Sequence, residues 1–464
     1  MLPSSRIKKL HFVGIGGAGM SGIAEILHRS GFDISGSDSG TGPVIQYLKE
    51  QGIEVSNQHR AENVEGVDLI VYSSAVPAEN PELVEGRNNN IPVIRRAEML
   101  GELMRLKYTL AIAGTHGKTT TTSLIGHVWS ECKKDPTIIV GGIVKNMGTG
   151  ALHGDGDTLI AEADEYDKSF LEMVPSMAVL TNIEEDHLDC YTDLDDIKNA
   201  FVQFSNKVPF YGQIIACVDD EGVRDVLSRI RKPLVTYGYS RQADYRVDKV
   251  ETKEMFTEVF VSAKGEKVGS YKIALSGKHN VQNSLAALAI GMEEGLGFED
   301  IARALESFGG VKRRFEYIAS VGNHHLYDDY AHHPSEVTAT LEGVRARYPD
   351  RELLVVFQPH LYSRTQDQFK HFASAFMNCD QLILAPIYGA REKPIEGVSS
   401  ELIAEQARKM GHDKVHCIED LGSVPSAVVS KIGQETGTIV ITMGAGSIWK
   451  SLEGIQKELE KKIG

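Results

Sequence analysis

The chain of 464 residues has no excess of basic residues, because 49 lysines and arginines stand against 64 aspartates and glutamates, a formal net charge of -15. Nucleic-acid-binding surfaces need a basic footprint, so we expect no nucleic-acid partner. An acidic protein binds phosphate groups only where a local lysine, arginine, backbone N–H group or metal reverses the field. Any phosphate site in this chain must therefore be built locally.

Cysteines are few, and none of them forms a C-x-x-C pair. They are Cys132, Cys190, Cys217, Cys379 and Cys417. Five scattered cysteines argue against a disulfide framework and a zinc ribbon, and they are typical of a reducing compartment. No apolar run reaches the length of about 18 residues that a membrane span requires, and the basic N-terminal stretch has only a short apolar run without a cleavage-like site. We therefore expect a cytoplasmic protein without a membrane partner.

Three segments do share one pattern, in which an apolar strand-like run leads into glycines and then a helix-like stretch. They are LHFVGIGGAGM (10–20), YTLAIAGTHGKT (108–119) and TIVITMGAGSIWK (438–450). Short β-rich runs alternate with longer helical stretches between them, at 68–74, 158–164, 177–183 and 352–358. This alternation is typical of doubly wound, parallel α/β sheets. The spacing predicts three α/β units in series.

The length fits two to four domains, at roughly 100–200 residues each. We predict domains at 1–106, 107–311 and 312–464. The first boundary falls just before the second glycine segment, and the other falls in GGVKRRFEYI (309–318), where a glycine pair and a basic cluster follow a helical stretch. Within the middle domain, residues 244–274 alternate apolar and polar side chains around Gly265. That alternation predicts antiparallel hairpin strands.

The second glycine segment has the context of a phosphate loop, because Gly114-Thr-His-Gly117-Lys118-Thr119 follows a strand and precedes a helix. Glycines let backbone N–H groups approach phosphate oxygens, the helix N-terminus adds a favourable dipole, and Lys118 supplies positive charge. The Thr119 hydroxyl can ligate Mg2+. The loop is shorter than the full Walker pattern, since Ile112 stands where that pattern has glycine. The alternative is a glycine-rich strand-to-helix turn in which the lysine has no role in binding phosphate.

Acidic residues follow two of the predicted strands. They are Glu162, Asp164, Glu165 and Asp167 in TLIAEADEYDKSF, and Asp186, followed by His187, in LTNIEEDHLD. Ligands of open α/β sheets bind at the carboxyl ends of strands, so these side chains are candidates for a magnesium site beside Thr119. The alternative is ordinary acidic loops in an acidic protein. The sequence lacks an N-K-x-D base-reading motif, which disfavours a GTPase.

The first glycine segment satisfies G-x-G-x-x-G with Gly14, Gly16 and Gly19, and Asp38 follows about twenty residues later. By spacing alone this is a dinucleotide fingerprint, with Asp38 set for a ribose hydroxyl. An NAD-dependent oxidoreductase is therefore a rival hypothesis. The pattern indicates a pyrophosphate bound near a helix N-terminus. It does not distinguish NAD from a nucleotide-sugar as the ligand.

Taken together and in order, these motifs resemble the Mur ligases, the ATP-dependent amide-forming enzymes of peptidoglycan synthesis. The motifs are GTHGKTTTT, EADEYD, TNIEEDHLD, GKHNVQNSLAAL (277–288), VKRRFE (311–316) and DDYAHHPSE (328–336). GIGGAGMSG with SGSD, and FQPHLYSRT (357–365), resemble the branch that joins L-alanine to UDP-N-acetylmuramate. The resemblance runs essentially from end to end. It implies a Rossmann-like UDP-substrate domain, a central P-loop ATPase-type domain with a mostly parallel sheet, and a Rossmann-like amino-acid-binding domain.

The resemblance also implies a mechanism with two cradles, one for the diphosphate of the UDP-sugar and one for ATP. The substrate carboxylate attacks the γ-phosphate to give an acyl phosphate and ADP, and the amine of L-alanine then displaces phosphate. The residues implied in catalysis are Lys118, Glu162, His187 and Arg314. Thr119 and Glu162 resemble ligands of one Mg2+, and His187 resembles a ligand of a second. Sister ligases carry a carbamylated lysine after that histidine, and Val202 and Gln203 stand in this neighbourhood here, which departs from the pattern unless Lys198 or Lys207 takes that place.

Binding residues follow from the same resemblance. For the nucleotide they are Gly114, Thr115, His116, Gly117, Lys118, Thr119, Thr120, Asn280, Asn283, Arg314 and Asp329. For the UDP-sugar they are Gly16, Gly17, Ala18, Gly19, Met20, Asp38, Ser73 and Ser74, and for the amino acid His360 and Arg364. An amino-acid carboxylate favours a guanidinium partner, although a structural salt bridge is the alternative for Arg364. Asn280 and Asn283 share a helical face, with helix capping as their alternative role. Asp329 resembles a residue that binds the ATP ribose or orients interdomain contacts.

Several alternatives remain open from the sequence. A recycling ligase would add a whole peptide to the same sugar. An oxidoreductase would leave Lys118, Thr119 and Arg314 without a role, and a regulator without catalysis would not need them. We expect no zinc in HHLYDDYAHHP, since the neighbours His332 and His333 would diverge on a strand and no H-E-x-x-H occurs. The protein is expected to be a monomer or a homodimer.

Overall fold

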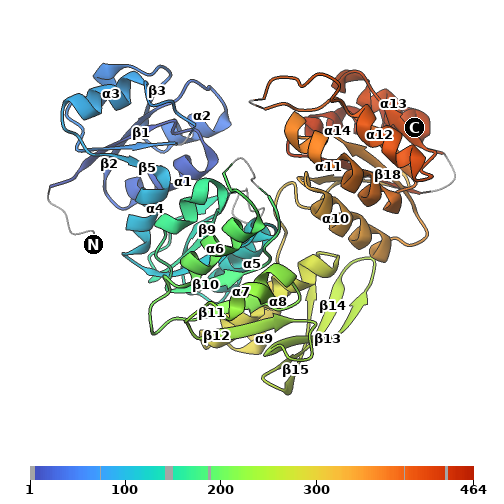
Figure 1. Cartoon of the computed structure of the whole chain (residues 1–464), viewed down its shortest axis with the longest axis horizontal. Coiled ribbons are helices and arrows are strands. Elements are labelled where there is room, and N and C mark those ends of the chain that lie inside the picture. Colours follow the sequence, from blue (N-terminus) through green and yellow to red (C-terminus); the bar gives the residue numbers. More distant parts are fainter. Residues whose placement is uncertain are drawn as a thin grey trace. The chain divides into compact units, whose positions relative to one another are not determined.

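The computed structural model describes residues 6–73, 75–141, 150–186, 190–390, 392–433 and 437–463. In this part of the chain the strands form three sheets, and the chain divides into two units (Figure 1). Unit 1 comprises Met1–Val250, Val259–Lys272 and Gln282–Gly309, and it holds the first sheet and nearly all of the second. Unit 2 comprises Glu251–Glu258, Ile273–Val281 and Gly310–Gly464, and it holds the third sheet.

The N-terminal sheet has the strand order β3-β2-β1-β4-β5, and its neighbouring strands are parallel. Its strands are β1 (Lys9–Val13), β2 (Asp33–Ser37), β3 (Glu54–Ser56), β4 (Leu69–Tyr72) and β5 (Val93–Arg95). The helices of this part are α1 (Ala18–Arg29), α2 (Pro43–Glu50), α3 (Pro81–Asn88) and α4 (Arg96–Met104). The order reverses direction between β1 and β4, so the first glycine loop opens at a topological switch point.

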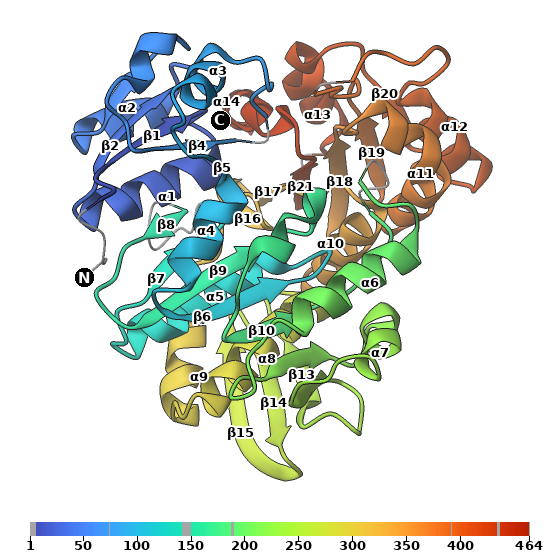
Figure 2. The same ribbon diagram turned by 60° about the vertical axis from the view of Figure 1, so that its left-hand side comes forward.

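The central sheet has the order β15-β14-β13-β12-β11-β10-β6-β9-β7-β8. Its strands are β6 (Tyr108–Ala113), β7 (Thr137–Ile139), β8 (Ala151–Leu152), β9 (Thr158–Ala163), β10 (Met177–Leu180), β11 (Ile214–Cys217), β12 (Leu234–Gly238), β13 (Tyr245–Thr252), β14 (Thr257–Ala263) and β15 (Glu266–Ile273). The helices are α5 (Lys118–Glu131), α6 (Leu194–Ser205), α7 (Glu221–Leu227), α8 (Lys278–Glu293) and α9 (Phe298–Glu306). The strand β6 runs parallel to both neighbours, β9 and β10, and α5 packs on β6 and β9 (Figure 2).

The predicted hairpin is present at one end of this sheet, where β14 and β15 are joined by a two-residue turn (Figure 1). Lys264 and Gly265 in the turn have φ of 49° and 90°. Two central residues with positive φ are typical of the type I′ turn, whose twist matches that of antiparallel strands. The alternating pattern of 244–274 therefore identified these strands correctly.

One hydrophobic cluster of unit 1 includes buried residues from both of its sheets. Phe170, in the 3-10 segment Tyr166–Glu172, stacks on Phe204 with ring centroids 4.9 Å apart and meets Phe201 edge-on at 5.2 Å. The N-terminal and central sheets thus share apolar packing, although the sequence pattern separates them into two domains.

The C-terminal sheet has the order β16-β17-β21-β18-β19-β20, with β16 antiparallel to β17 and the other pairs parallel. Its strands are β16 (Glu316–Val321), β17 (His324–Asp329), β18 (Glu352–Phe357), β19 (Gln381–Leu384), β20 (Val415–Cys417) and β21 (Thr438–Met443). The helices are α10 (Pro334–Arg347), α11 (Tyr362–Ala375), α12 (Glu401–Lys409), α13 (Val424–Lys431) and α14 (Leu452–Ile463). One core cluster joins the sheet to α10, α11 and α12, and another joins it to α13 and α14, so helices cover both faces.

These observations confirm the predicted α/β class with three mostly parallel sheets. The strands predicted at 68–74, 158–164, 177–183 and 352–358 are β4, β9, β10 and β18, each shorter at its carboxyl end because the chain turns there into a loop. The five cysteines all lie in the described residues, and none of them forms a disulfide bond. Among the described residues, no helix is both long enough and apolar enough to cross a membrane. The domain boundaries at 106/107 and 311/312 stay predictions.

Candidate active site

The loop between β6 and α5 needs glycine at two positions. Gly114 and Gly117 have φ of 147° and 80°, values that side-chain-bearing residues rarely adopt. A Cβ on Gly114 would collide with the Thr181 hydroxyl, and a Cβ on Gly117 would lie 2.7 Å from the amide oxygen of Asn283. The loop is therefore closely packed as well as sharply turned, which is the shape a phosphate cradle requires.

The segment after β10 holds this loop in place. The backbone N–H of His116 donates to Asn182 Oδ1 at 2.7 Å, and the Thr181 hydroxyl donates to the His116 carbonyl at 2.7 Å. The Thr115 N–H donates to the Asn182 carbonyl at 3.1 Å. These segments meet at the carboxyl ends of their strands, as predicted, because β6 and β10 are parallel neighbours. We did not single out Asn182 from the sequence, although its place directly after a strand was the available signal.

Lys118 begins α5 and is largely buried. Its ammonium group donates to the carbonyls of Gly114 (2.7 Å) and Thr115 (3.0 Å) and pairs with Glu165 at 2.7 Å. Burial acts to lower the pKa of Lys118, but the charges of Glu165, Asp164 and Glu162 outweigh it and raise the pKa. Burial raises the pKa of Glu165, against the opposing charge of Lys118. The lysine therefore stays charged at the loop.

Thr119 and Glu162 meet as the magnesium hypothesis requires. The Thr119 hydroxyl donates to Glu162 Oε1 and Oε2 at 3.0 and 3.1 Å, and the Gly141 N–H donates to Oε2 at 2.8 Å. Glu162 lies near the end of β9, beside the phosphate loop. A hydroxyl and a carboxylate offer the hard oxygen ligands that Mg2+ prefers, so these residues fit that ion. His187, predicted for a second metal, lies outside the described residues.

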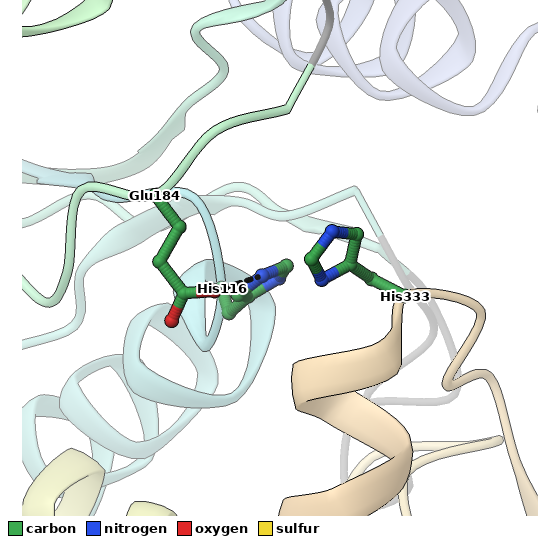
Figure 3. A group of neighbouring side chains, drawn as sticks. All are labelled: His116, Glu184 and His333. Atoms are coloured by element: carbon green, nitrogen blue, oxygen red, sulfur yellow. Dashed lines mark ion pairs between the residues drawn. The ribbon is translucent and has the colours of Figure 1, made fainter. Parts of the chain in front are cut away.

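His116 also interacts with Glu184, whose Oε2 lies 3.4 Å from His116 Nε2 (Figure 3). Figure 3 further shows His333 immediately before α10. The Nδ1 atom of His333 lies 2.7 Å from the Ser335 hydroxyl, whereas His332 Nδ1 lies 3.1 Å from the Tyr330 carbonyl. The Nδ1 atoms of the two neighbouring histidines thus have different partners. Neither residue lies on a strand, since β17 ends at Asp329.

The first glycine loop is closed by Asp38. One carboxylate oxygen accepts from the Gly16 N–H at 2.8 Å, and the other accepts from the Gly40 N–H at 2.8 Å. Gly14 turns the chain with φ of 79°. A Cβ on Gly19 would lie 2.6 Å from the guanidinium nitrogen Nη1 of Arg96, at the start of α4. Arg96 thus lies against the loop, and we did not single it out from the sequence.

The remaining predicted sugar-binding residues differ in their surroundings. The Met20 side chain is buried in the core, and its N–H donates to the Gly17 carbonyl at 2.9 Å, so it supports the loop from within. The Ser73 N–H donates to the Val13 carbonyl at 3.2 Å at the same sheet edge. Gly17 is the residue before α1, with no side-chain cap. Ser74 and the side chain of Ala18 lie outside the described residues.

The two asparagines of α8 have different partners. The Asn280 side chain, in the first turn of α8, donates to the Ser276 carbonyl at 2.8 Å. The Asn283 side chain packs against Gly117 of the phosphate loop. Both are buried. Of the two, Asn283 is the one that the structure brings to the loop.

In unit 2, a strained turn carries Arg314. Its neighbours Arg313 and Phe315 have φ of 60° and 45°. The buried carboxylate of Asp329 accepts from the Phe315 N–H at 2.8 Å and from the Ala331 N–H at 2.7 Å. Burial raises the pKa of Asp329 to about 6, against the opposing effects of Arg314 and these two hydrogen bonds. Asp329 therefore fixes the turn that presents Arg314.

The guanidinium of Arg314 itself is restrained on two sides. It lies 3.4 Å from Glu336 Oε1 and over the Tyr330 ring at 5.2 Å. Glu336 Oε2 also accepts from the His332 N–H at 3.0 Å. The His332 ring meets the His360 ring edge-on, with centroids 5.7 Å apart. These contacts connect the Arg314 turn to the predicted amino-acid site within one unit.

His360 and Arg364 lie where β18 passes into α11. Glu392 holds this helix start by accepting from the N–H groups of Tyr362 (2.6 Å) and Ser363 (3.0 Å). Burial lowers the pKa of His360 to about 4, and His332 and Arg364 add to the effect. His360 therefore presents a neutral imidazole at neutral pH in the segment before α11, and Arg364 lies in the first turn of that helix.

Comparison with known proteins agrees with this geometry. Residues 9–108 match the family model described as Mur ligase family, catalytic domain, residues 112–291 match the Mur ligase middle domain, and residues 313–446 match the Mur ligase, glutamate ligase domain. The UDP-N-acetylmuramate–L-alanine ligase of Salinibacter ruber is 47% identical over 460 residues, covering 99% of this chain and 96% of that protein. The protein of the same name from Geobacter sulfurreducens is 46% identical over 457 residues, covering 98% of each.

Solved structures show the same likeness. The crystal structure of the UDP-N-acetylmuramate-alanine ligase of Thermotoga maritima has a TM-score of 0.82 and 28% identity, covering 98% of this chain and 99% of that one. A murein peptide ligase from Psychrobacter arcticus shares the fold, with a TM-score of 0.69 and 21% identity over 98% and 99% of the two chains. The chain therefore belongs to the Mur ligase family.

Proposed function

We propose that this protein joins L-alanine to UDP-N-acetylmuramate and converts ATP to ADP and phosphate. The observation that carries the proposal is the pair of glycine loops in unit 1, one with Asp38 and Arg96 and the other with Lys118, Thr119 and Glu162. Full-length relatives at 46–47% identity bear the name of this activity. An oxidoreductase would need only the first of the two loops.

The reaction requires two anions to approach each other, because a substrate carboxylate must attack a terminal phosphate. Positioning and charge neutralisation carry most of the catalysis of phosphoryl transfer. We assign Lys118 to the β- and γ-phosphates, where its raised pKa keeps it charged, and Arg314 to the charge that develops on the γ-phosphate. Thr119 and Glu162 would hold Mg2+, which supplies further positive charge against the phosphates.

The UDP-sugar is assigned to the first loop. Its diphosphate would lie at the N-terminus of α1, where Gly17 provides no side-chain cap and the helix dipole favours an anion. Asp38 fixes the loop at Gly16. The carboxylate of the sugar then becomes an acyl phosphate, and the amine of the amino acid attacks it with loss of phosphate.

The amino acid is assigned to His360 and Arg364. A guanidinium binds a carboxylate with paired hydrogen bonds, and a neutral imidazole near it can accept a hydrogen bond from an amino group. The contacts from His360 through His332 and Glu336 lead to Arg314 in the same unit. This arrangement places recognition of the amine donor next to the residue assigned to the γ-phosphate.

The test is phosphate release from ATP with UDP-N-acetylmuramate and, in turn, L-alanine, L-serine, glycine and a tripeptide. We expect L-alanine to support release, and oxygen-18 in the sugar carboxylate to appear in the phosphate. Release with the tripeptide alone would favour a recycling ligase. NADH-dependent turnover without phosphate release would favour the oxidoreductase.

Replacement of the loop lysine tests the nucleotide assignment. We expect Lys118→Ala to abolish turnover, because the phosphates lose their charged partner, while circular dichroism and the melting temperature show an intact fold. An active Lys118→Ala enzyme would contradict the assignment of the phosphate loop.

A further inference from the structure

The third glycine segment of the chain, 444–447, has no role in the proposed function so far. It follows β21 and precedes a 3-10 segment, Ile448–Ser451, in unit 2. Locally it looks like another phosphate cradle, but its backbone donors are already engaged. The N–H groups of Ser447 and Ile448 both donate to Gln358 Oε1, at 2.8 and 3.0 Å, and Gln358 is only 3% exposed. The N–H groups at the start of the 3-10 segment are therefore already bound to a side chain.

The loop instead packs against a tyrosine. Gly446 is buried, and a Cβ added to it would lie 2.9 Å from both Cβ and Cγ of Tyr388 and would collide with the amide oxygen of Gln358. The neighbouring Gly444 is equally confined, since its Cβ would lie 2.6 Å from the Gln358 carbonyl. The backbone of 444–446 therefore forms a close-fitting surface behind the Tyr388 side chain.

Tyr388 is in turn fixed to His360. The two residues form a parallel β-bridge, in which the Leu361 N–H donates to the Tyr388 carbonyl at 2.9 Å and the Tyr388 N–H donates to the Pro359 carbonyl at 2.8 Å. Their rings stack with centroids 5.7 Å apart and an angle of 19° between the ring planes. Tyr388 is nevertheless 41% exposed, so part of this clamped side chain faces open space.

We propose that the stack of Gly446, Tyr388 and His360 is the wall that limits the size of the incoming amino acid. The inference rests on the proposed function, in which His360 and Arg364 receive that amino acid. The backbone behind Tyr388 has no room for one methyl group, and close-packed protein interiors resist such displacement. The ring therefore cannot retreat to admit a larger side chain. The third glycine loop thus holds Tyr388 in place and limits the size of the amino-acid side chain that the site admits.

The first experiment compares kcat/KM for L-alanine, L-valine and L-leucine in the wild type and in Tyr388→Ala. We expect the preference for L-alanine to fall at least tenfold, since a pocket distinguishes single methylene groups by about 10–200-fold. KM for ATP and UDP-N-acetylmuramate should stay within twofold. Tyr317→Ala is the matched control, because Tyr317 is a half-exposed tyrosine of β16 in the same unit. Its preference should equal that of the wild type.

The second experiment changes the third glycine loop. Gly446→Ala should raise KM for L-alanine at least fivefold, because its methyl group displaces the Tyr388 ring. In Gly446→Ala/Tyr388→Ala the two effects on KM for L-alanine should sum to less than the single changes predict. The contact of the methyl group with the Tyr388 Cγ and ring is then gone, and only its contacts with the Cβ of residue 388 and the Gln358 amide oxygen remain.

Two results would overturn the proposal. One is an unchanged ratio of L-alanine to L-valine in Tyr388→Ala, or in Tyr388→Leu should the alanine variant not fold. The other is additivity in the double variant. Failure of the proposed function looks different, because the wild type itself would then release no phosphate with any amino acid, and the size inference would fall with it.

Discussion

At the residue scale, the loop between β6 and α5 holds its lysine through three partners. The three donors of the Lys118 ammonium group are matched by Gly114, Thr115 and Glu165. Glu165 is the one negatively charged partner among these three, and its carboxylate competes with phosphate for the same ammonium. On the proposed assignment, ATP binding would transfer the lysine from a buried carboxylate to the phosphates.

The variant Glu165→Gln tests this competition. The amide keeps an acceptor oxygen for Lys118 but removes the negative charge, so we expect the dissociation constant for ATP to fall several-fold by calorimetry without the UDP-sugar. Glu131→Gln, an exposed change at the end of the same helix, is the control and should leave the constant unchanged. Weaker ATP binding by Glu165→Gln would show that the carboxylate positions the lysine rather than competing for it.

A second residue-scale prediction concerns pH and Asp329. Its pKa is about 6 in the folded protein and near 3.8 ordinarily, because burial outweighs the nearby Arg314 and the hydrogen bonds. Below about pH 6 the protonated carboxyl no longer accepts both the Phe315 and Ala331 N–H groups as a carboxylate does. We therefore expect kcat/KM for ATP to fall as the pH falls through about 6, and the acid limb to disappear in Asp329→Asn.

The contribution of Asp329 to the free energy of unfolding should decrease as the pH rises, whereas kcat/KM for ATP should increase. A carboxyl whose folded pKa is raised binds its proton more tightly when folded, so its stabilising contribution is present below about pH 4 and is lost as the pH rises through about 6. Urea unfolding at pH 4.5 and pH 7 measures this contribution as the difference between the wild type and Asp329→Asn. An acid limb of activity that persists unchanged in Asp329→Asn would contradict the role given to Asp329.

At the element scale, the loop between β6 and α5 depends on glycine. Gly117→Ala introduces strain at φ of 80° and places a methyl group 2.7 Å from the Asn283 amide oxygen. We expect kcat/KM for ATP to fall about 100-fold or more, because small misplacements of reacting groups cost that much. Gly265→Ala is the matched control: its φ of 90° gives a comparable backbone cost of about 1 kcal/mol, but nothing lies within 4 Å of the added atom. Equal activity of the two variants would contradict the prediction.

The sequence predicted these elements well wherever the signal was local. Apolar runs ending in glycine identified β1, β6 and β21, and alternation identified the hairpin of β14 and β15. The partners could not be predicted, because they come from distant parts of the chain. Asn182 lies 66 residues from His116, and Gln358 lies 89 residues from Ser447.

The third glycine loop shows the limit of local pattern most clearly. Its sequence has two glycines, as many as the second segment and two fewer than the first, yet the N–H groups of Ser447 and Ile448 are bound to Gln358. Arg96 could not be assigned for a related reason, since only the fold of the N-terminal sheet brings α4 to Gly19. A glycine-rich strand-to-helix turn thus predicts the course of the backbone. Residues that are distant in the sequence determine which ligand this backbone can bind.

At the scale of the whole molecule, the chain has three sheets but two units. The sheets of unit 1 share one hydrophobic cluster, whereas the third sheet has clusters on both of its faces within unit 2. Cooperative unfolding follows shared packing rather than sheet number. We therefore expect two calorimetric transitions rather than three.

Two core variants test this expectation. Phe170→Ala removes the ring stacked on Phe204 in unit 1, and Phe372→Ala removes a ring packed on Phe357 in unit 2. Each should destabilise by about 3–5 kcal/mol and lower one transition while leaving the other in place. A single transition that both variants lower equally would show that the molecule unfolds as one body.

The two-residue turn at Lys264 and Gly265 has a practical consequence. Both residues are exposed, and the entropy of closing a loop rises only slowly with its length. A short affinity peptide or a fluorophore-labelling sequence spliced between them would lengthen a surface connection without entering any core. The enzyme could then be captured on a solid support for inhibitor screening with both chain ends left native.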